Sequence, residues 1–256
     1  MTRILHFTDA HLRWNQPGSA DNPARLSREM PSILARLADQ IPKLRPDAIV
    51  MTGDLLDVPN DVLVGAPDDG RAMDAWRCEI DADFQIFKDW FERTGVPWLA
   101  VPGNHDDEDA FRRVFGEPPI YTDIAGLRFF TYWDELGPDR QPHRSGARQS
   151  LFEAALTAPE HDLPQVHLQH YMIDPPTRAR GWNYEYRNAA QMKRELDRSG
   201  RVRAILSGHY HPGSLAHGED GLIHSLPPAF SESPHFFRLY DVGSTGEIKI
   251  QELAVV

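Results

Sequence analysis

Five short apolar segments of this chain, each the length of a buried strand, are followed at once by clusters of Asp, Asn and His. The five clusters are Asp9-Ala10-His11, Gly53-Asp54-Leu55-Leu56-Asp57, Gly103-Asn104-His105-Asp106, His170, and Gly208-His209-Tyr210-His211. In open α/β sheets the loops after the carboxyl ends of the strands converge, and ligands bind there. The pattern therefore predicts an α/β fold in which these polar side chains meet at one edge.

Strands and helices alternate along most of the chain, and the C-terminal fifth changes to short strands. We predict strands at 3–8, 48–51, 97–101, 165–169 and 203–206, a hairpin within 120–133, and late strands near 214–217, 221–226, 235–241 and 247–253. We predict helices within 24–44 (begun or interrupted at Pro31) and at 72–94, 108–115, 148–157 and 187–199. Residues 58–70 and 134–146 are expected to be surface loops. This order indicates two packed sheets flanked by helices.

The length and the apolar pattern indicate one domain covering residues 1–256. A chain of 256 residues with 41% hydrophobic content can bury one substantial core. The predicted helix at 72–94 carries its large apolar residues on one face, which is typical of core packing rather than of an aromatic binding site. These residues are Trp76, Ile80, Phe84, Phe87, Trp90 and Phe91.

Charge and composition exclude several classes of partner. The net charge is -11, with 27 Lys and Arg against 38 Asp and Glu, so binding to a nucleic acid polymer is not expected. The apolar runs are shorter than the roughly 18 residues of a membrane span. A single cysteine, Cys78, and a first segment too short and polar for a signal peptide favour a cytoplasmic location. No pattern indicates an oligomeric state.

The residue types in the five clusters suit metal binding. Carboxylate and amide oxygens together with imidazole nitrogens suit Mn, Fe, Zn or Co, and the lack of thiolates argues against a structural zinc site. The glycines before Asp54, Asn104 and His209 would allow sharp turns or a close approach to a ligand. Each polar residue alone could be a cap or a turn residue; five clusters at one edge indicate a site.

Two residues compete for one of the ligand positions. His167 lies three residues before His170, on the opposite face of the strand, and we favour His170 because it stands at the strand end. Asp106 is expected to hydrogen-bond the loop that carries His105. The remaining histidines are interpreted as strand or surface residues, with His224 and His235 as the two that could contact substrate. They are His6, His143, His161, His217, His224 and His235.

The ordered set of motifs resembles the calcineurin-like metallophosphoesterase family, and the resemblance spans residues 9 to 211. It implies an α/β fold of the four-layer α/β/β/α type, with two mixed β-sheets flanked by helices. It also implies two divalent or trivalent metal ions, Mn or Fe being favoured and Zn or Co possible. By this resemblance one metal is bound by Asp9, His11 and His211, the other by Asn104, His170 and His209, with Asp54 bridging them.

The resemblance further implies that His105 is the acid near the leaving group and that Asp57 orients it. Two metals would clamp the phosphoryl oxygens and lower the pKa of a water molecule toward 7, which makes a hydroxide nucleophile. Imidazole titrates near neutral pH and suits protonation of the departing alkoxide.

Differences from the motifs of several subfamilies reduce the number of substrate classes to be considered. Val58-Pro59 follows Asp57 where protein phosphatases carry an arginine, and Asp57 stands where purple acid phosphatases need a tyrosine. Repair nucleases of the family have longer chains and a DNA-binding surface. The run from Trp98 to Asp106 resembles bacterial cyclic nucleotide phosphodiesterases and their glycerophosphodiesterase relatives. We therefore predict hydrolysis of a small phosphodiester such as a 3′,5′-cyclic nucleotide.

Two alternatives accompany this prediction. A phosphomonoesterase or nucleotide pyrophosphatase could use the same site, and a non-catalytic relative could use the fold as an interaction platform. Specificity would lie in the loops, where a base could stack on Trp14, Trp182 or Tyr184. Other candidates for substrate contact are Arg13, Asn15, Asn60, Arg178, Arg180 and Asn183.

Overall fold

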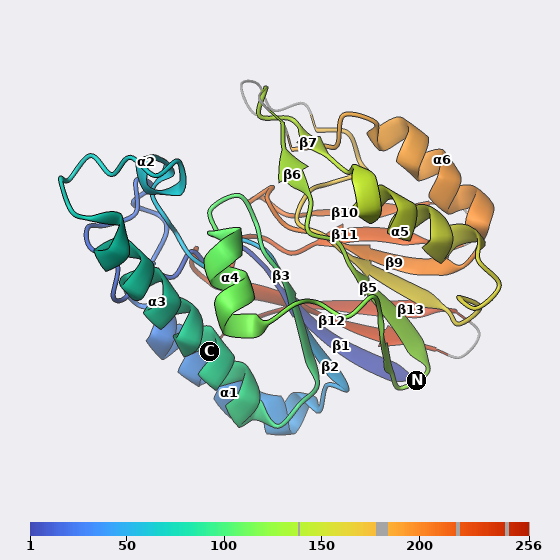
Figure 1. Ribbon diagram of the computed structural model, residues 1–256. Coiled ribbons are helices and arrows are strands. Elements are labelled where there is room, and N and C mark those ends of the chain that lie inside the picture. The colour runs from blue at the N-terminus through green and yellow to red at the C-terminus, as the bar shows by residue number, and fades with distance from the viewer. Residues whose placement is uncertain (138, 178–183, 219–220, 244–245, 256) are drawn as a thin grey trace.

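The strands of the protein form two large mixed sheets that pack against each other (Figure 1). The computed structural model describes residues 1–137, 139–177, 184–218, 221–243 and 246–255. The first sheet has the order β13-β12-β1-β2-β3, in which β1, β2 and β3 are parallel and β12 and β13 are antiparallel to their neighbours. Its strands are β1 (Thr2–Phe7), β2 (Ala48–Thr52), β3 (Trp98–Val101), β12 (Phe236–Val242) and β13 (Ile248–Ala254).

The second sheet has the order β10-β11-β9-β8-β5-β4. Its four central strands are parallel, and each edge strand pairs antiparallel with its neighbour. The strands are β4 (Thr122–Ile124), β5 (Leu127–Thr131), β8 (Gln165–Leu168), β9 (Val202–Leu206), β10 (Ser214–His217) and β11 (Ile223–Leu226). The hairpin predicted within 120–133 is formed by β4 and β5, with Ala125 and Gly126 at positive φ in its turn.

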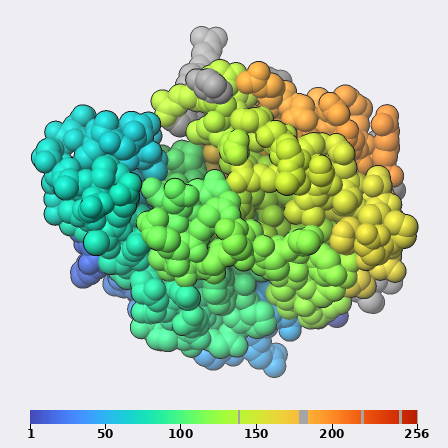
Figure 2. Space-filling model, viewed as in Figure 1, coloured from blue at the N-terminus to red at the C-terminus, as the bar shows by residue number. Residues whose placement is uncertain are grey.

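Helices cover the outer face of each sheet (Figure 1). The first sheet is covered by α1 (Met30–Leu44) and α3 (Met73–Thr94), with α4 (Glu108–Phe115) beside α3. The second sheet is covered by α5 (Gly146–Thr157) and α6 (Ala189–Ser199). The predicted four-layer α/β/β/α sandwich with two mixed sheets is therefore confirmed. In Figure 2 the side chains of α3, α4, α5 and adjoining segments close the face turned to the viewer.

The main hydrophobic core follows from the apolar strands and one helix face. All five residues of β2 are buried, as expected for a parallel strand covered on both sides. The predicted apolar face of α3 is buried, and full burial of a side chain such as Phe84 contributes about 1.5–3 kcal/mol. A second apolar cluster lies between the second sheet and α5 and α6.

The helix predicted within 24–44 is present, whereas two predicted loops contain regular structure. The helix begins at Met30, and Pro31 occupies its first turn, where the missing N–H costs nothing. Residues 24–29 therefore belong to a loop that reaches the candidate site. The segments 58–70 and 134–146 are not plain surface loops. The first contains α2 (Asn60–Leu63) with Val62 buried, and the second contains β6 (Glu135–Leu136) and β7 (Pro142–His143).

The second of these segments also contains a buried ion pair that the sequence did not indicate. Arg144 donates from Nε and Nη2 to the Asp134 carboxylate at 2.9 and 2.7 Å, and both side chains are fully buried. The Arg144 guanidinium lies 3.8 Å from the ring centroid of Tyr132. Pairing and aromatic stacking together make this burial tolerable for two charges.

No helix among the described residues is both long enough and apolar enough to cross a membrane.

Candidate metal centre

The parallel strands bring the five polar clusters together between the two sheets. Backbone hydrogen bonds join the loops: the Asp9 amide donates to Gly53, the His11 amide to Asp54 at 2.9 Å, and the Gly208 amide to His170 at 2.8 Å. The clusters after β1, β2, β3, β8 and β9 thereby meet at one edge, as the carboxyl ends of parallel strands do.

Three groups of potential ligand atoms result from this convergence, and within each group the ligand atoms lie within 4.8 Å of one another. Two of them contain only predicted ligands: Asp9, His11 and His211 form one, and Asp54, His170 and His209 form the other. The third group overlaps the first two and consists of His11, Asp54 and His105. Nε2 of His11 and Nε2 of His211 face each other at 3.1 Å. Two imidazole nitrogens that converge in this way suit a shared cation.

Asp54 lies between the two groups. Its Oδ2 is 3.7 Å from Nε2 of His11 and 3.4 Å from Nε2 of His170. Oδ1 of Asn104 lies 3.2 Å from Nε2 of His170, so the amide oxygen is directed to the second group. The structure thus brings all seven predicted ligand residues together, with Asp54 within 4 Å of a histidine of each group.

Four of these residues have strained backbones. Among the described residues, eight other than glycine have positive φ, and they include Asp9 (54°), His11 (48°), Asp54 (50°) and His209 (70°). A conformation of this kind costs on the order of 1–3 kcal/mol for a residue with a side chain and tends to occur at functional sites. Here it turns each polar side chain sharply out of its strand toward a common point.

Gly103 and Gly208 are required by close packing inside the centre. A Cβ atom on Gly103 would lie 2.2 Å from Oδ1 of Asp54, and one on Gly208 would lie 2.1 Å from Oγ1 of Thr8. The predicted close approach at the glycines before Asn104 and His209 is thereby explained.

Hydrogen bonds outside the ligand groups orient two of the imidazoles. His170 donates from Nδ1 to the Thr52 carbonyl at 2.8 Å, and His211 donates from Nδ1 to the Glu232 carboxylate at 2.8 Å. In each ring this leaves Nε2 directed to the centre. Carbonyl and carboxylate partners of this type are usual for metal-binding histidines.

The charge balance of the centre fits bound cations. The Asp9 and Asp54 carboxylates are buried, and no Lys or Arg among the described residues forms an ion pair with either. Burial lowers the pKa of His170, but the neighbouring Asp54 and Asp9 outweigh it and raise that pKa to about 9. Burial lowers the pKa of His11 to about 3. Two buried carboxylates without a Lys or Arg partner suit a site that binds cations.

Asp57 lies beside this centre and faces His105. Its Oδ1 is 3.6 Å from Nδ1 of His105 and 3.6 Å from Nδ1 of His11. Burial acts to raise the pKa of Asp57, but His11, Arg13 and Arg25 overcome it, and the pKa is held well below the ordinary value. Asp57 is therefore a permanent carboxylate.

Asp106 fixes the loop that carries His105, as predicted. Its carboxylate accepts hydrogen bonds from the backbone N–H groups of Leu55, Leu56 and Gly103 at 2.8–3.1 Å. Burial and the charge of Asp54 raise its pKa to about 7.

A cavity of about 440 Å³ opens over the ligands, which we call the central cavity. Its described lining residues are Asp21, Asn22, Arg25, Asp54, Asn60, Asn104, His105, Tyr184, His209, His211, Pro212 and Glu232. The Tyr184 ring centroid lies 5.3 Å from that of His209. Of the loop residues proposed from sequence, Asn60 and Tyr184 reach the cavity.

The other proposed substrate contacts divide into three cases. Trp14 is exposed, and neither His224 nor His235 is among the described residues that line the central cavity. Arg13 is buried against Asp57 instead of facing the cavity. Arg178, Arg180, Trp182 and Asn183 lie outside the described residues.

Sequence reasoning missed several residues of the site. Glu232 and Arg25 lie far from the motifs and have no spacing signal of their own. Asp83 was hidden within the apolar face of α3. Its buried carboxylate accepts hydrogen bonds from the backbone amides of Trp14, Asn15 and Gln16, which anchors the loop after the first ligand pair. A buried Asp in such a helix face is the signal that could have been noticed.

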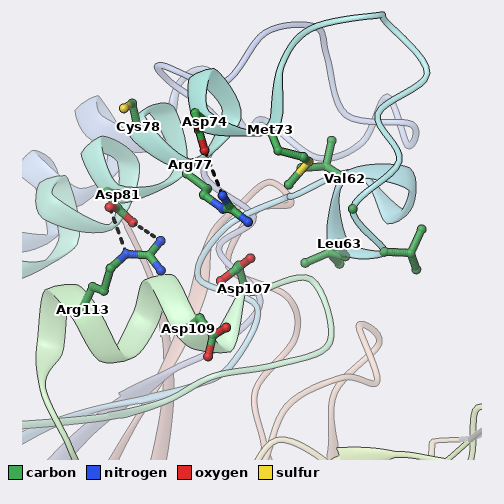
Figure 3. Close-up of a pocket in the computed structure, with 12 residues that line it drawn as sticks. Val62, Leu63, Met73, Asp74, Arg77, Cys78, Asp81, Asp107, Asp109 and Arg113 are labelled. Carbon is green, nitrogen blue, oxygen red and sulfur yellow. Dashed lines mark hydrogen bonds and ion pairs between the residues drawn. The ribbon is translucent and has the colours of Figure 1, made fainter.

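A larger cavity of about 700 Å³ lies between α2, α3 and α4, away from the ligand groups (Figure 3). Arg77 pairs there with Asp74, and Arg113 pairs with Asp81. Its acidic residues are not part of the three ligand groups found among the described residues. Size alone therefore does not identify the functional site of this protein.

Comparison with known proteins agrees with the fold. The sequence model of the calcineurin-like phosphoesterase family matches residues 2–213, and the chain belongs to that family. It is 28% identical over 227 residues to a probable cyclic nucleotide phosphodiesterase of Rhodococcus erythropolis, covering 83% of this chain and 66% of the relative. It is also 28% identical to a cAMP/cGMP dual specificity phosphodiesterase of Mycobacterium tuberculosis, covering 81% of this chain and 61% of the relative.

The chain therefore spans slightly less than two thirds of the length of these relatives. Among solved structures, a dimetal phosphatase from Danio rerio superposes with a TM-score of 0.68 at 14% identity, covering 100% of this chain and 96% of the other. That likeness establishes the shared fold.

Proposed function

We propose that the protein is a metal-dependent hydrolase of small phosphodiesters, with 3′,5′-cyclic nucleotides as the leading substrates. The observation that carries this proposal is the convergence of two ligand groups, joined by Asp54, on a cavity that also contains His105. The proposed metal ligands are Asp9, His11, Asp54, Asn104, His170, His209 and His211, and Mn or Fe are the favoured ions.

The carboxylates of the centre are already oriented to bind cations, which in turn would bind an anionic substrate. Metal ions bound there would neutralise charge on the phosphoryl oxygens and lower the pKa of a water molecule. Asp9 accepts the His209 amide and Asp54 accepts the His105 amide, so both carboxylates are oriented before any ligand binds. Fixed ligands of this kind avoid reorganisation during the reaction.

His105 is proposed to protonate the leaving group. As an oxygen from water forms its bond to phosphorus, the bond to the leaving oxygen breaks and that oxygen takes a proton from His105. Asp57 faces Nδ1 of His105, which leaves Nε2 to face the cavity. A positioned acid of this kind typically contributes about 10²–10⁴-fold to the rate.

The size and lining of the central cavity favour a small substrate. Its volume of about 440 Å³ lies within the usual range for small-molecule sites. Tyr184 offers an aromatic face for a base, and Asn22 and Asn60 offer amides that can pair with ribose or base. The names of the two bacterial relatives and the net charge of -11, which disfavours nucleic acid polymers, support the same substrate class.

We also propose that residues 1–256 form one domain. The family match ends at residue 213, yet β12 and β13 beyond it belong to the first sheet, where β12 pairs with β1. Removal of these strands would expose β1, so the segment is integral to the fold.

A metal-reconstituted substrate screen tests the function. Protein loaded with Mn, Fe, Zn or Co would be assayed with cyclic nucleotides, bis-p-nitrophenyl phosphate, phosphomonoesters and nucleotide diphosphate derivatives, and kcat/KM would be compared. We expect diesters to have the highest values. Higher values for monoesters or diphosphates would favour the phosphomonoesterase or pyrophosphatase alternative. Bound metal without any hydrolysis would favour the non-catalytic interaction platform.

A further inference from the structure

Arg25 is the one Lys or Arg among the described residues that line the central cavity. It belongs to the loop between β1 and α1. The cavity lining also contains the carboxyl groups of Asp21, Asp54 and Glu232. An anionic phosphate ester that enters the cavity therefore meets several negative charges and a single cationic side chain.

Arg25 and Arg13 both contact Asp57, but their guanidinium groups are used differently. Arg13 directs Nε and Nη2 to Asp57 and Nη1 to the Ser19 carbonyl at 2.8 Å, so every nitrogen has a protein acceptor. Arg25 donates from Nη1 to Oδ1 of Asp57 at 2.8 Å, whereas its Nε is buried without a hydrogen-bond partner in the described structure. The buried Nε is closed to the cavity, so the donor left for a ligand is Nη2, for which no hydrogen bond is found within the described structure.

The contact with Asp57 places the Arg25 guanidinium near His105, the proposed acid. Oδ1 of Asp57 accepts from Arg25 and lies 3.6 Å from Nδ1 of His105. Arg25 and His105 are thus neighbours on the same carboxylate and on the same cavity wall. A phosphoryl group whose leaving oxygen reached His105 would bring a non-bridging oxygen near the Arg25 guanidinium, since both side chains line the cavity.

A guanidinium group can bind two anions at the same time. Its planar fork can bind a carboxylate along one edge and a phosphate oxygen along another, which the point charge of lysine cannot do. The position after Asp57 is Val58, so that position supplies no cation. Arg25 supplies one from a different loop, and Asp57 holds it in place.

We propose that Arg25 is a substrate-binding residue that donates to a non-bridging phosphoryl oxygen while Nη1 stays on Asp57. The inference rests on the proposed function, because it assumes that a phosphate group occupies the central cavity. It assigns phosphate recognition to the loop between β1 and α1, in addition to the metal ligands.

The test compares Arg25→Ala and Arg25→Lys with wild type, all loaded with the same metal. Arg36→Ala is the matched control, because Arg36 is exposed on α1 and its removal changes the net charge equally. Three quantities would be measured: KM and kcat for bis-p-nitrophenyl phosphate, the dissociation constant of inorganic phosphate by calorimetry, and metal content by elemental analysis.

We expect Arg25→Ala to keep its metal and to raise both KM and the phosphate dissociation constant by about 10- to 100-fold, the usual effect of losing a charged hydrogen bond. Arg25→Lys should recover only part of this loss, and Arg36→Ala should match wild type. Unchanged phosphate affinity in a metal-loaded Arg25→Ala protein would overturn the inference, as would a change confined to kcat and unfolding.

If Arg25→Ala does not fold, Arg25→Lys decides: phosphate affinity equal to wild type would overturn the inference. Absence of diester hydrolysis by wild type would instead contradict the proposed function. The phosphate-binding comparison would still test Arg25 in that case.

Discussion

Arg13 donates three hydrogen bonds to Asp57: two to its backbone carbonyl, at 3.0 and 2.6 Å, and one to its carboxylate, at 2.9 Å. This contact joins the loop after the first ligand pair to the residue that faces His105. Asp83 anchors the same loop from α3. The orientation of the proposed general acid therefore depends on a sequence of buried contacts that begins in the helix layer.

Arg13→Ala should destabilise the protein and reduce kcat. The side chains of Arg13 and Asp57 are 7% and 4% exposed, and breaking a buried pair typically costs about 3–5 kcal/mol. Because Arg25 still contacts Asp57, we expect the lower part of this range. The free energy of unfolding would be measured in urea, with Arg13→Lys as the variant that keeps the charge but loses the fork. An unchanged unfolding free energy in Arg13→Ala would contradict this interpretation.

His105→Ala should lower kcat by about 10²–10⁴-fold while metal content stays at the wild-type level. The reason is that His105 faces Asp57 and the cavity but is not among the seven proposed ligands. Steady-state kinetics and elemental analysis would be compared with His217→Ala, which removes an exposed histidine from β10. Loss of metal from His105→Ala, or unchanged kcat, would remove His105 from its assigned role.

Gly103→Ala should disrupt the centre, because the new Cβ would lie 2.2 Å from Oδ1 and 2.4 Å from the backbone nitrogen of Asp54. Overpacking of this kind typically costs about 1–3 kcal/mol and would displace the proposed bridging residue. Metal content and thermal unfolding would be measured. Gly95→Ala serves as the comparison: it meets open space and adds only the strain of positive φ, about 1–2 kcal/mol. Full metal binding by Gly103→Ala would show that the loop can move aside.

His167→Gln should flatten the dependence of stability on pH below 6.5. Burial, with a smaller effect from Arg144, lowers the pKa of His167 well below its ordinary value. Below pH 6.5 the unfolded chain takes up a proton that the folded protein excludes, so stability falls as pH falls and is fully retained above 6.5. One such histidine contributes about 1.4 kcal/mol per pH unit to that slope.

The slope would be obtained from urea unfolding at several pH values between 4.5 and 7.5. His6 is buried with a lowered pKa in the same way, so the variant should keep part of the wild-type slope. Identical slopes in wild type and His167→Gln would mean that His167 is protonated in the folded state.

Much of the fold could be predicted from the chain because its signals are local. A short continuous apolar run marked strand β2, and a period-3.6 apolar pattern marked helix α3, each within a few residues. The polar clusters were informative because each follows a strand, and parallel strands bring their carboxyl ends to one edge. The convergence of Asp9 and His211 could therefore be expected although about two hundred positions separate them, whereas their membership in one ligand group was implied by the family resemblance.

Tertiary structure decided what has no periodicity and no motif. Arg25, Asp83 and Glu232 take their positions from loops and helix faces whose path depends on packing across the whole molecule. Trp14 and Tyr184 looked equivalent as aromatic candidates, yet only Tyr184 lines the central cavity among the described residues. Sequence by itself determined the succession of strands and helices along the chain, the apolar residues of the core and the types of metal-binding side chain. These features follow from residue type and spacing. Which other residues surround the proposed ligands was decided only by the tertiary structure, because contacts between distant parts of the chain set the path of each loop.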